Sequence, residues 1–277
     1  MSPCYIKRLT SAGLQDVDYQ ANSLAEAVQY EPANGIYTVT NTFNTFKTLK
    51  FEAHLDRLED SAQRAGITLN LDRLQLKQAL RQMIADANYG DVRFRVTVSQ
   101  NASDTFIISL EPFTPLSKSF KDKGVRCITA KNSARHNAAA KTTDWMHTRK
   151  GLQQAMPDGI YDTILLDKNG QMLEGLGSNF YAILNNELRT ADKHILLGIA
   201  QQIVFEVAPN IIPLNHQAVH IDNIPQLSEA FITSSSRGIV PVVEIDGIPI
   251  GTGDVGEITQ SLIQAYDQWV TEHLEDL

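Results

Sequence analysis

The chain has 277 residues, a length that corresponds to about two domains with cores of ordinary size. Apolar residues make up 43% and charged residues 20%, which excludes disordered, collagen-like and membrane-protein compositions. With 24 Lys plus Arg against 32 Asp plus Glu, the net charge is −8, the wrong sign for a protein that neutralises nucleic-acid phosphates. We therefore expect no nucleic-acid partner.

Targeting and cysteine signals point the same way. The first residues, MSPCYIKRLTSAGLQD, lack the apolar core of a signal peptide, and no apolar run approaches the roughly 20 residues of a membrane span. Cys4 and Cys127 stand far apart, in neither a CxxC motif nor a Cys/His cluster. We expect a cytoplasmic protein without a membrane partner, with two reduced structural thiols and no metal site.

The first half of the chain predicts one α/β unit. Residues rich in β-branched and aromatic side chains predict strands, and apolar spacing typical of an amphipathic helix predicts helices. In chain order the expected elements are a strand, two helices and two strands, at residues 35–43, 50–66, 71–87, 92–98 and 105–111. We assign residues 1–115 to an N-terminal α/β domain.

Residues 116–124 hold prolines, a glycine and short polar or basic residues without apolar periodicity, which is typical of an interdomain linker. Beyond them, residues 125–277 predict a strand-rich C-terminal domain with hairpins instead of a βαβ series. The expected strands are 125–130, 162–167, 171–184, 229–235, 240–246 and 248–251, and the expected helices are about 199–208 and 257–274.

Residues 251–256 spell GTGDVG, a literal GxGxxG that follows a strand and opens a helix. A dinucleotide site also needs a second parallel strand carrying a ribose-binding acid. The chain continues for only about 20 residues, and the preceding strand belongs to an antiparallel hairpin. We therefore interpret the motif as a glycine-rich turn.

Lys141 and Glu174 carry more specific chemistry. Lys141 stands among small residues in AAAKTT, and the neutral amine of a desolvated lysine forms a Schiff base with an aldehyde. Glu174, in LEGLGSNF, is flanked by glycines that let a planar ligand approach the backbone. A carboxylate beside a pyridine nitrogen keeps it protonated, which makes a pyridoxal ring an electron sink. For each residue, a solvated surface position is the alternative interpretation.

Further segments would suit a phosphate dianion. Gly198 and Ile199 open a predicted helix whose N-terminal amides favour anions, and residues 233–236 form a run of hydroxyls. Arg57, within HLDRLEDS, would add a formal charge, with an exposed helical arginine as the alternative.

In this order the motifs resemble the class IV aminotransferases, the fold type IV pyridoxal-phosphate enzymes that include branched-chain and D-amino acid aminotransferases and aminodeoxychorismate lyase. The resemblance runs from Gly35 to the C-terminal helix. It is carried by HLDRLEDSA, AKTTDW, LEGLGSNFYAI, LLGIAQQIV and ITSSSRGIVPVVEIDGIPIGTGDVGEIT. It implies an α/β (α+β) fold with a small N-terminal domain, a larger strand-rich C-terminal domain, pyridoxal 5'-phosphate between them, and a homodimer.

The resemblance also implies a role for each matching residue. Lys141 would be the Schiff-base lysine and Glu174 the partner of the pyridine nitrogen. The phosphate would be bound by Arg57, the Ile199 amide, Ser234, Ser235 and Ser236, with the serines also lining the carboxylate pocket. Tyr37 would face the substrate, and Trp145, beside the lysine motif, is a further candidate.

Several positions depart from the family pattern. Ala200 and Gln201 stand where many relatives have Thr-Arg, so one phosphate-binding hydroxyl is missing. Relatives commonly have Asn-Tyr where Asp144 and Trp145 stand, and a glutamate where Thr38 stands. Val98 occupies the place of the substrate-binding arginine of D-amino acid aminotransferases.

Arg93 stands where branched-chain enzymes carry an arginine, and it shares one strand face with Arg95 and Thr97 because side chains alternate along a strand. We expect Arg93 or Arg95 to bind a carboxylate, with two solvated edge-strand arginines as the alternative.

The function expected from these residues is transfer of an amino group from an amino acid to a 2-oxo acid such as 2-oxoglutarate, by a ping-pong mechanism. Arg93 and Val98 favour a branched-chain L-amino acid, with a D-amino acid as the alternative. Two other functions stay open: elimination of pyruvate from 4-amino-4-deoxychorismate, and a non-catalytic protein that binds pyridoxal phosphate or another metabolite.

Overall fold

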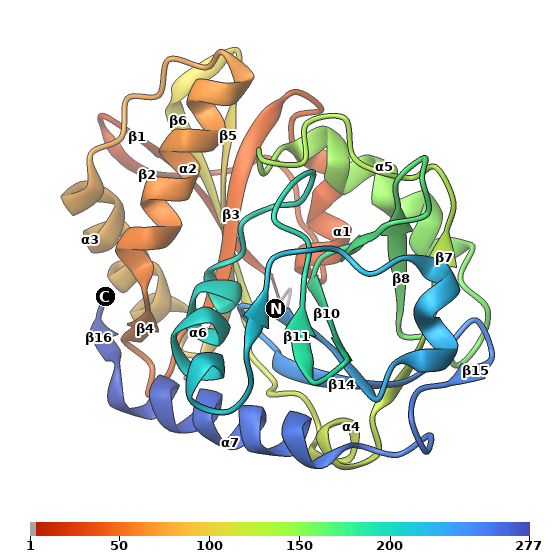
Figure 1. Ribbon diagram of the computed structural model, residues 1–277. Helices are drawn as coiled ribbons and strands as arrows, with labels where there is room; N and C mark the ends of the chain where they lie inside the picture. The colour runs from red at the N-terminus through yellow and green to blue at the C-terminus, as the bar shows by residue number, and fades with distance from the viewer. Residues whose placement is uncertain (1–3) are drawn as a thin grey trace. The chain divides into compact units, whose positions relative to one another are not determined.

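A five-stranded antiparallel sheet organises the first of two units into which the chain divides. The computed structural model describes residues 4–277. The first unit contains residues up to Thr114, with Ala140–Thr148 and His273–Leu277. Its strands follow the order β2-β1-β6-β5-β3 (Figure 1). Their bounds are β1 Tyr5–Thr10, β2 Gly13–Asp16, β3 Gly35–Asn41, β5 Val92–Ser99 and β6 Ala102–Pro112.

Two helices, α2 (Phe51–Ala65) and α3 (Arg73–Ala87), cover one face of this sheet (Figure 1). Their apolar stripes pack on alternate residues of the strands, which point to that face because a strand has a two-residue period. The shared core includes Leu55, Leu58, Leu80, Phe94, Val96 and Ile108. These elements lie where the sequence predicts them, to within a few residues.

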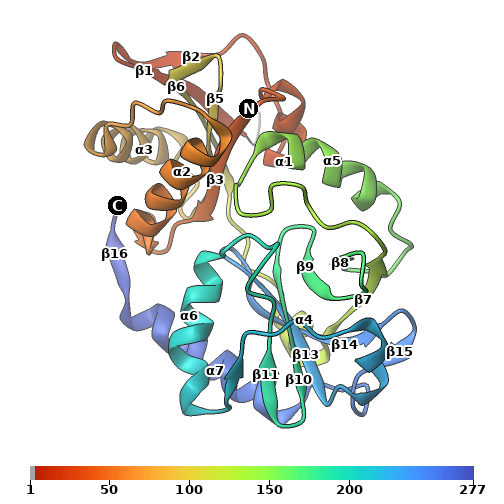
Figure 2. The same cartoon turned by 45° about the horizontal axis from the view of Figure 1, so that its top comes forward.

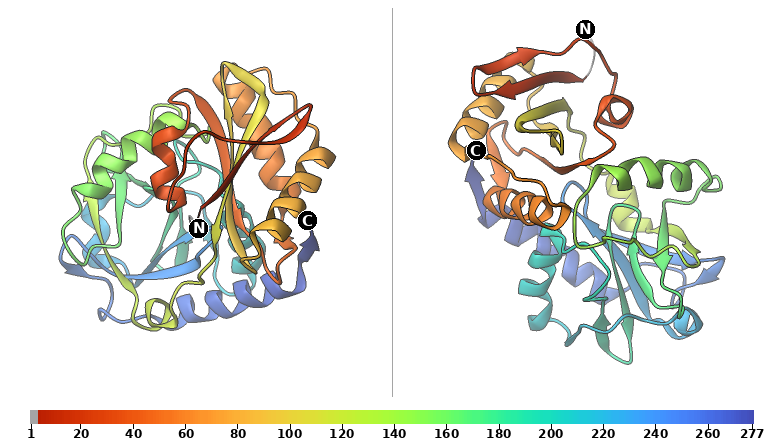
Figure 3. Two further views of the ribbon diagram at one scale, coloured as in Figure 1. Left: turned by 180° about the vertical axis from the view of Figure 1, so that it is seen from behind. Right: turned by 90° about the horizontal axis from the view of Figure 1, so that it is seen from above.

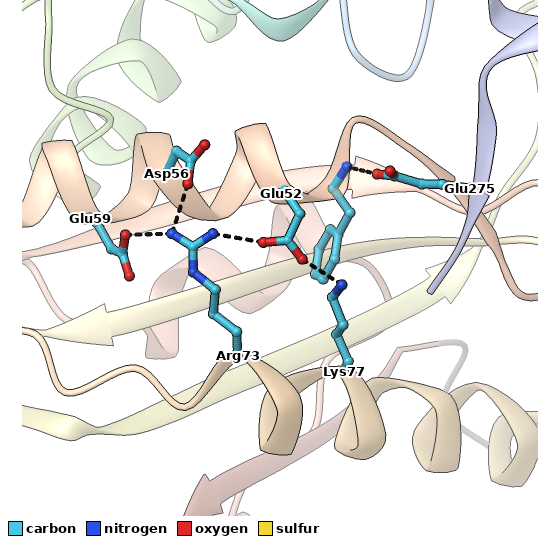
Figure 4. A network of polar contacts seen from close by, with 7 residues as sticks. Glu52, Asp56, Glu59, Arg73, Lys77 and Glu275 are labelled. Carbon is cyan, nitrogen blue, oxygen red and sulfur yellow. Dashed lines mark hydrogen bonds and ion pairs between the residues drawn. The ribbon is translucent and has the colours of Figure 1, made fainter.

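Charged residues join α2 to α3 on the solvent side (Figure 4). The Arg73 guanidinium lies 2.7 Å from a carboxylate oxygen of Glu52 and 2.7 Å from one of Asp56, and it also contacts Glu59. At the first turn of α2, the Phe51 N–H donates to the Glu275 carboxylate. Glu275 belongs to β16 (Leu274–Asp276), which pairs with β4 (Lys47–Leu49).

The opposite face of the sheet carries α1 (Leu24–Ala27), the 3-10 turn η1 (Val28–Tyr30) and the N-terminal hairpin, which is drawn in red from behind in Figure 3. Ala140–Thr148 belongs to this unit, and Thr142 forms an antiparallel bridge with Ile36 of β3. The catalytic candidate Lys141 is therefore positioned by the N-terminal sheet.

The second unit, Pro115–Ala139 with Arg149–Glu272, is built on a nine-stranded sheet. Pairing between β9 and β10 closes the path β10-β13-β14-β7-β8-β9 into a ring, whose core includes Cys127, Ile164, Phe180, Ile232 and Val240. The ring strands are β7 Val125–Ala130, β8 Asp162–Leu166, β9 Met172–Gly175, β10 Asn179–Leu184, β13 Glu229–Ser234 and β14 Gly238–Ile245. Outside the ring lie β11 Glu187–Arg189, β12 Leu214–Asn215 and β15 Ile248–Pro249.

The expectation of hairpins in place of parallel strands is wrong for part of this unit. β7 pairs in parallel with β8 and with β14, and β11 pairs in parallel with β12. The chain between β7 and β8 contains a helix, α5 (Thr143–Gln154), and a parallel pair needs such a long connection. The sequence TDWMHTRKGLQQ has no continuous apolar stripe, so periodicity did not predict α5.

Two smaller differences affect expected segments. The expected strand 171–184 is two strands, β9 and β10, joined by a tight turn. The expected linker 116–124 contains a short helix, α4 (Lys118–Lys123). The domain limits drawn from the sequence, 1–115 and 125–277, stay predictions.

Helices α6 (Ile199–Val207) and α7 (Glu257–Glu272) lie side by side in the second unit (Figure 2). The GTGDVG turn leads into α7, and the Glu229 carboxylate accepts hydrogen bonds from the Ile258 and Thr259 N–H groups at 3.1 and 2.7 Å. A side-chain carboxylate thus occupies the helix N-terminus that would receive a dinucleotide phosphate. The strand before this turn pairs in antiparallel with β14, as the sequence predicts.

Within residues 4–277, no helix is both long and apolar enough to cross a membrane. The same residues include no group of three or more His, Cys, Asp or Glu side chains arranged to hold a metal ion.

Candidate active site

Lys141 lies in an extended segment beside β3. Its carbonyl oxygen accepts a hydrogen bond from the Tyr37 N–H at 3.0 Å. Its own N–H donates to the Ser61 Oγ at 3.0 Å. The backbone of Lys141 is therefore anchored to β3 on one side and to α2 on the other, and its side chain remains to reach a ligand.

The Lys141 amine lies over an aromatic ring. Its Nζ is 4.6 Å from the centroid of Tyr37, and a cation in this position is stabilised by the ring quadrupole. Tyr37 is buried and packs against Val28 and Met146. Trp145, the residue before Met146 on α5, is half-buried. The structure thus brings the predicted residues Lys141 and Tyr37 into contact.

Arg57 occupies the same face of α2 as His54 and Ser61, as their spacing along a helix requires. Its Nη2 lies 3.4 Å from His54 Nδ1, which is 2.9 Å from the Thr38 Oγ1. Burial lowers the pKa of Arg57 to about 10. Burial, reinforced by the cations Arg57 and Lys141, holds the pKa of His54 well below its usual range. The cluster thus combines two cations with a neutral imidazole.

Glu174, on β9, is buried and held by two donors. Arg135 Nη1 lies 3.2 Å from its Oε1, and the Leu196 N–H donates to its Oε2 at 3.0 Å. The Arg135 side chain is buried as well, so the pair is removed from solvent. Both donors stabilise the carboxylate as an anion. Glu174 is therefore equipped to accept a hydrogen bond from a protonated ring nitrogen.

The turn after Glu174 is fixed by Asp162 at the start of β8. One Asp162 oxygen accepts from the Leu176 N–H at 3.0 Å, and the other accepts from the Ser178 Oγ at 2.8 Å. A side chain on Gly175 would meet Ser178, because an ideal Cβ there would lie 2.2 Å from its Oγ. The glycines that the sequence analysis assigned to ligand approach thus include one that the turn itself requires.

Asn179 on β10 brings the other predicted residues of the second unit together. It lies directly opposite Glu174 on one side and opposite Thr233 on the other, one residue before Ser234. Its Oδ1 would be 2.1 Å from an ideal Cβ on Gly198, the residue before Ile199 at the start of α6. Ser234, Ser235 and Ser236 are half-buried, and the Ser234 Oγ accepts from Arg237 Nε at 2.8 Å. The structure therefore gathers Glu174, Ile199 and the serines around one asparagine.

Arg93 and Arg95 have different surroundings. The Arg93 guanidinium lies 3.6 Å from Glu111, with its side chain 44% exposed. Arg95 is buried, and its Nε donates to Glu31 Oε1 at 2.6 Å while its Nη2 donates to the Leu24 carbonyl at 2.9 Å. Thr97 donates its hydroxyl to the other Glu31 oxygen at 2.5 Å. The Arg95 guanidinium is thus engaged by a carboxylate of its own chain.

Comparison with known proteins assigns this arrangement to a family. The model described as "Amino-transferase class IV" matches residues 35–245. The chain belongs to the class IV aminotransferases. Among its relatives are the D-alanine aminotransferase of Bacillus licheniformis, 28% identical over 84% of this chain and 86% of the relative, and a branched-chain-amino-acid aminotransferase of Pseudomonas aeruginosa, 23% identical over 82% and 80%.

The fold agrees with this assignment. The branched-chain aminotransferase of Thermoproteus uzoniensis, solved with norvaline, superimposes with a TM-score of 0.80 at 22% identity, covering 98% of each chain. The α/β fold of type IV enzymes expected from the sequence is confirmed, as is membership of an enzyme family that uses pyridoxal phosphate.

The residues of this class IV aminotransferase fit that cofactor. Lys141 offers a primary amine, the cluster of Arg57 and Lys141 suits a dianion, and Glu174 offers a buried carboxylate. The close approach of Gly198 to Asn179 leaves no room for a side chain at the start of α6, which favours access of a phosphate to the first amides of that helix.

Sequence reasoning missed several neighbours of this class IV aminotransferase site: Glu31, His54, Ser61, Arg135, Asp162 and Asn179. A signal existed for His54 and Ser61, because both are polar residues on the buried, otherwise apolar face of α2. The others have no such local signal, since their partners lie far away in the sequence.

Proposed function

We propose that this class IV aminotransferase transfers the amino group of a branched-chain L-amino acid to a 2-oxo acid such as 2-oxoglutarate. The observation that carries the proposal is the placement of Lys141, whose backbone is anchored to β3 and α2 while its amine lies over Tyr37. An amine held in this way can serve one substrate carbon repeatedly, as general acid–base catalysis requires.

Pyridoxal phosphate, when bound, holds the amino group and withdraws the electron pair left on the substrate α-carbon. The Lys141 Nζ removes the proton from that carbon and holds it until it is returned at the end of the half-reaction. Glu174 keeps a proton on the ring nitrogen, and Arg135 and the Leu196 N–H keep Glu174 charged and oriented. Arg57, the Ile199 amide and Ser234, Ser235 and Ser236 bind the phosphate.

The proposed donor rests on the substrate-side residues. Since Arg95 is engaged by Glu31, Arg93 is the arginine that we assign to the substrate carboxylate, and Tyr37 and Trp145 line the donor site. A D-amino acid is the alternative donor, because D-alanine aminotransferases cover as much of the chain as the branched-chain relatives. The homodimeric state and the cytoplasmic location stay predictions.

The test is an initial-rate assay of the protein loaded with pyridoxal phosphate, with L-leucine or D-alanine as donor and 2-oxoglutarate as acceptor. We expect faster glutamate formation with L-leucine and parallel double-reciprocal lines, because a ping-pong enzyme releases its first product before the acceptor binds. Faster turnover of D-alanine would reverse the donor assignment. Pyruvate release from aminodeoxychorismate without an acceptor would replace transamination by elimination.

Lys141→Ala tests the assignment of the amine. We expect the turnover rate to fall by about a thousand-fold or more, because the variant loses both the covalent link and the proton carrier. Lys123→Ala is the control, since Lys123 is an exposed lysine on α4. Comparable activity in the Lys141 variant and in the control would remove Lys141 from the mechanism.

A further inference from the structure

We propose that His54 is a positioning residue that orients the Arg57 guanidinium toward the phosphate of the cofactor, with Thr38 as its neutral support. The proposal rests on the proposed role of Arg57 and adds a residue to which the sequence analysis gave no function.

The geometry fixes the protonation of the imidazole. His54 is 1% exposed, and its Nδ1 lies 3.4 Å from Arg57 Nη2 and 2.9 Å from the Thr38 Oγ1. A guanidinium has no acceptor, so Nδ1 must accept from it, and the proton of the neutral ring is on Nε2. The Thr38 hydroxyl then donates to the same nitrogen. The ring is thus held by Thr38 from β3 and faces Arg57 on its own helix.

The neutrality of His54 matters for the charge of Arg57. A carboxylate at this place would pair with the guanidinium and compete with a phosphate for it, while a protonated imidazole would repel it. Burial and the nearby cations Arg57 and Lys141 keep the pKa of His54 low, so the ring accepts without adding charge. The guanidinium is therefore oriented while its full charge remains for a dianion.

Thr38 and Ala200 make this arrangement specific to the present chain. Thr38 is a neutral residue where relatives commonly carry a glutamate, so no carboxylate at this position competes for Arg57. Ala200 lacks the hydroxyl that many relatives offer to the phosphate. A larger share of phosphate binding thus falls to Arg57, and with it to the residue that orients Arg57.

The experiment compares the dissociation constants of pyridoxal phosphate and of pyridoxal, which lacks the phosphate, for protein freed of cofactor. We expect His54→Leu to weaken pyridoxal phosphate about ten-fold and to leave pyridoxal unchanged, because the lost interaction serves a charged donor. We expect His54→Asn to retain most of the affinity, since its amide oxygen can accept near the position of Nδ1. His147→Leu, at an exposed histidine on α5, is the matched control.

The outcomes separate the two assignments. If Arg57→Ala leaves the ratio of the two constants unchanged, the proposed phosphate role of Arg57 fails. If Arg57→Ala changes the ratio and His54→Leu does not, the role of His54 is overturned. Equal weakening of both ligands would indicate a merely structural residue and would also overturn it. Where His54→Leu does not fold, the pair His54→Asn and His54→Gln decides, because glutamine places its amide nearer to Nε2 and should not rescue the ratio.

Discussion

The buried ion pair between Glu31 and Arg95 is the feature whose removal should affect folding most clearly. The two side chains are 1% and 5% exposed, and Thr97 donates a further hydrogen bond to Glu31. Glu31→Leu would leave the Arg95 guanidinium buried without its carboxylate. Breaking a buried pair by removing one partner costs about 3–5 kcal/mol, so we expect the free energy of unfolding to fall by that amount.

The double variant Glu31→Leu/Arg95→Met gives the more informative value. Replacing both charges by apolar side chains of similar size removes the desolvation cost together with the attraction. We therefore expect the double variant to unfold within about 2 kcal/mol of the natural chain, well above Glu31→Leu alone. The difference is the coupling energy of the pair, which a double-mutant cycle isolates.

The assay is urea unfolding followed by tryptophan fluorescence, with Lys118→Ala as control. Lys118 and its partner Asp122 form an exposed pair, 84% and 52% exposed, and such pairs contribute little. With a slope of about 1–3 kcal/mol per molar urea, Glu31→Leu should lower the midpoint by about 1 M or more. A shift no larger than that of Lys118→Ala, or a double variant as unstable as Glu31→Leu, would refute the reasoning.

The same pair bears on substrate binding. Thr97, which donates to Glu31, lies directly opposite Tyr37 across the β3–β5 ladder. Glu31 therefore keeps both Arg95 and Thr97 engaged one strand away from the residue beneath the Lys141 amine. This neighbourhood is the physical reason for assigning the substrate carboxylate to Arg93 instead of Arg95.

Three further predictions follow from burial and charge. The pKa of His54 is depressed in the folded protein, so below about pH 6.5 unfolded His54 binds a proton that folded His54 does not; stability should then fall by up to about 1.4 kcal/mol per pH unit. His54→Asn should flatten this slope in pH-dependent urea titrations, and an unchanged slope would contradict it. Arg73→Ala should destabilise α2 and α3 by about 1 kcal/mol, less at about 1 M salt, and a salt-independent loss of unfolding free energy would argue against electrostatics. Burial raises the pKa of Cys4 to about 12 and also raises that of Cys127, so both thiols should resist Ellman's reagent at about pH 8 until urea unfolds the chain; rapid labelling of native protein would count against their burial.

Local pattern was sufficient for the elements of the first unit. α2 and α3 carry continuous apolar stripes, and β3, β5 and β6 are rich in β-branched and aromatic residues, so periodicity alone placed them. The family motifs likewise selected Lys141, Glu174 and Arg57 before any coordinates were considered, because they are short segments whose chemistry is contained in a few adjacent residues.

Tertiary structure decided whatever depends on residues distant in the chain. α5 lacks an apolar stripe, and the break between β9 and β10 depends on Asp162, which holds the Leu176 N–H and the Ser178 hydroxyl from another strand. Glu31 and Arg95 are 64 residues apart, and Arg135 and Glu174 are 39 apart. Hydrogen bonds and ion pairs of this kind leave no periodic trace in a sequence, because their partners are brought together only by strand pairing and packing. The sequence therefore determined which residues could perform the chemistry, and the fold decided which of them are available to a ligand and which, like Arg95, are held by another part of the chain.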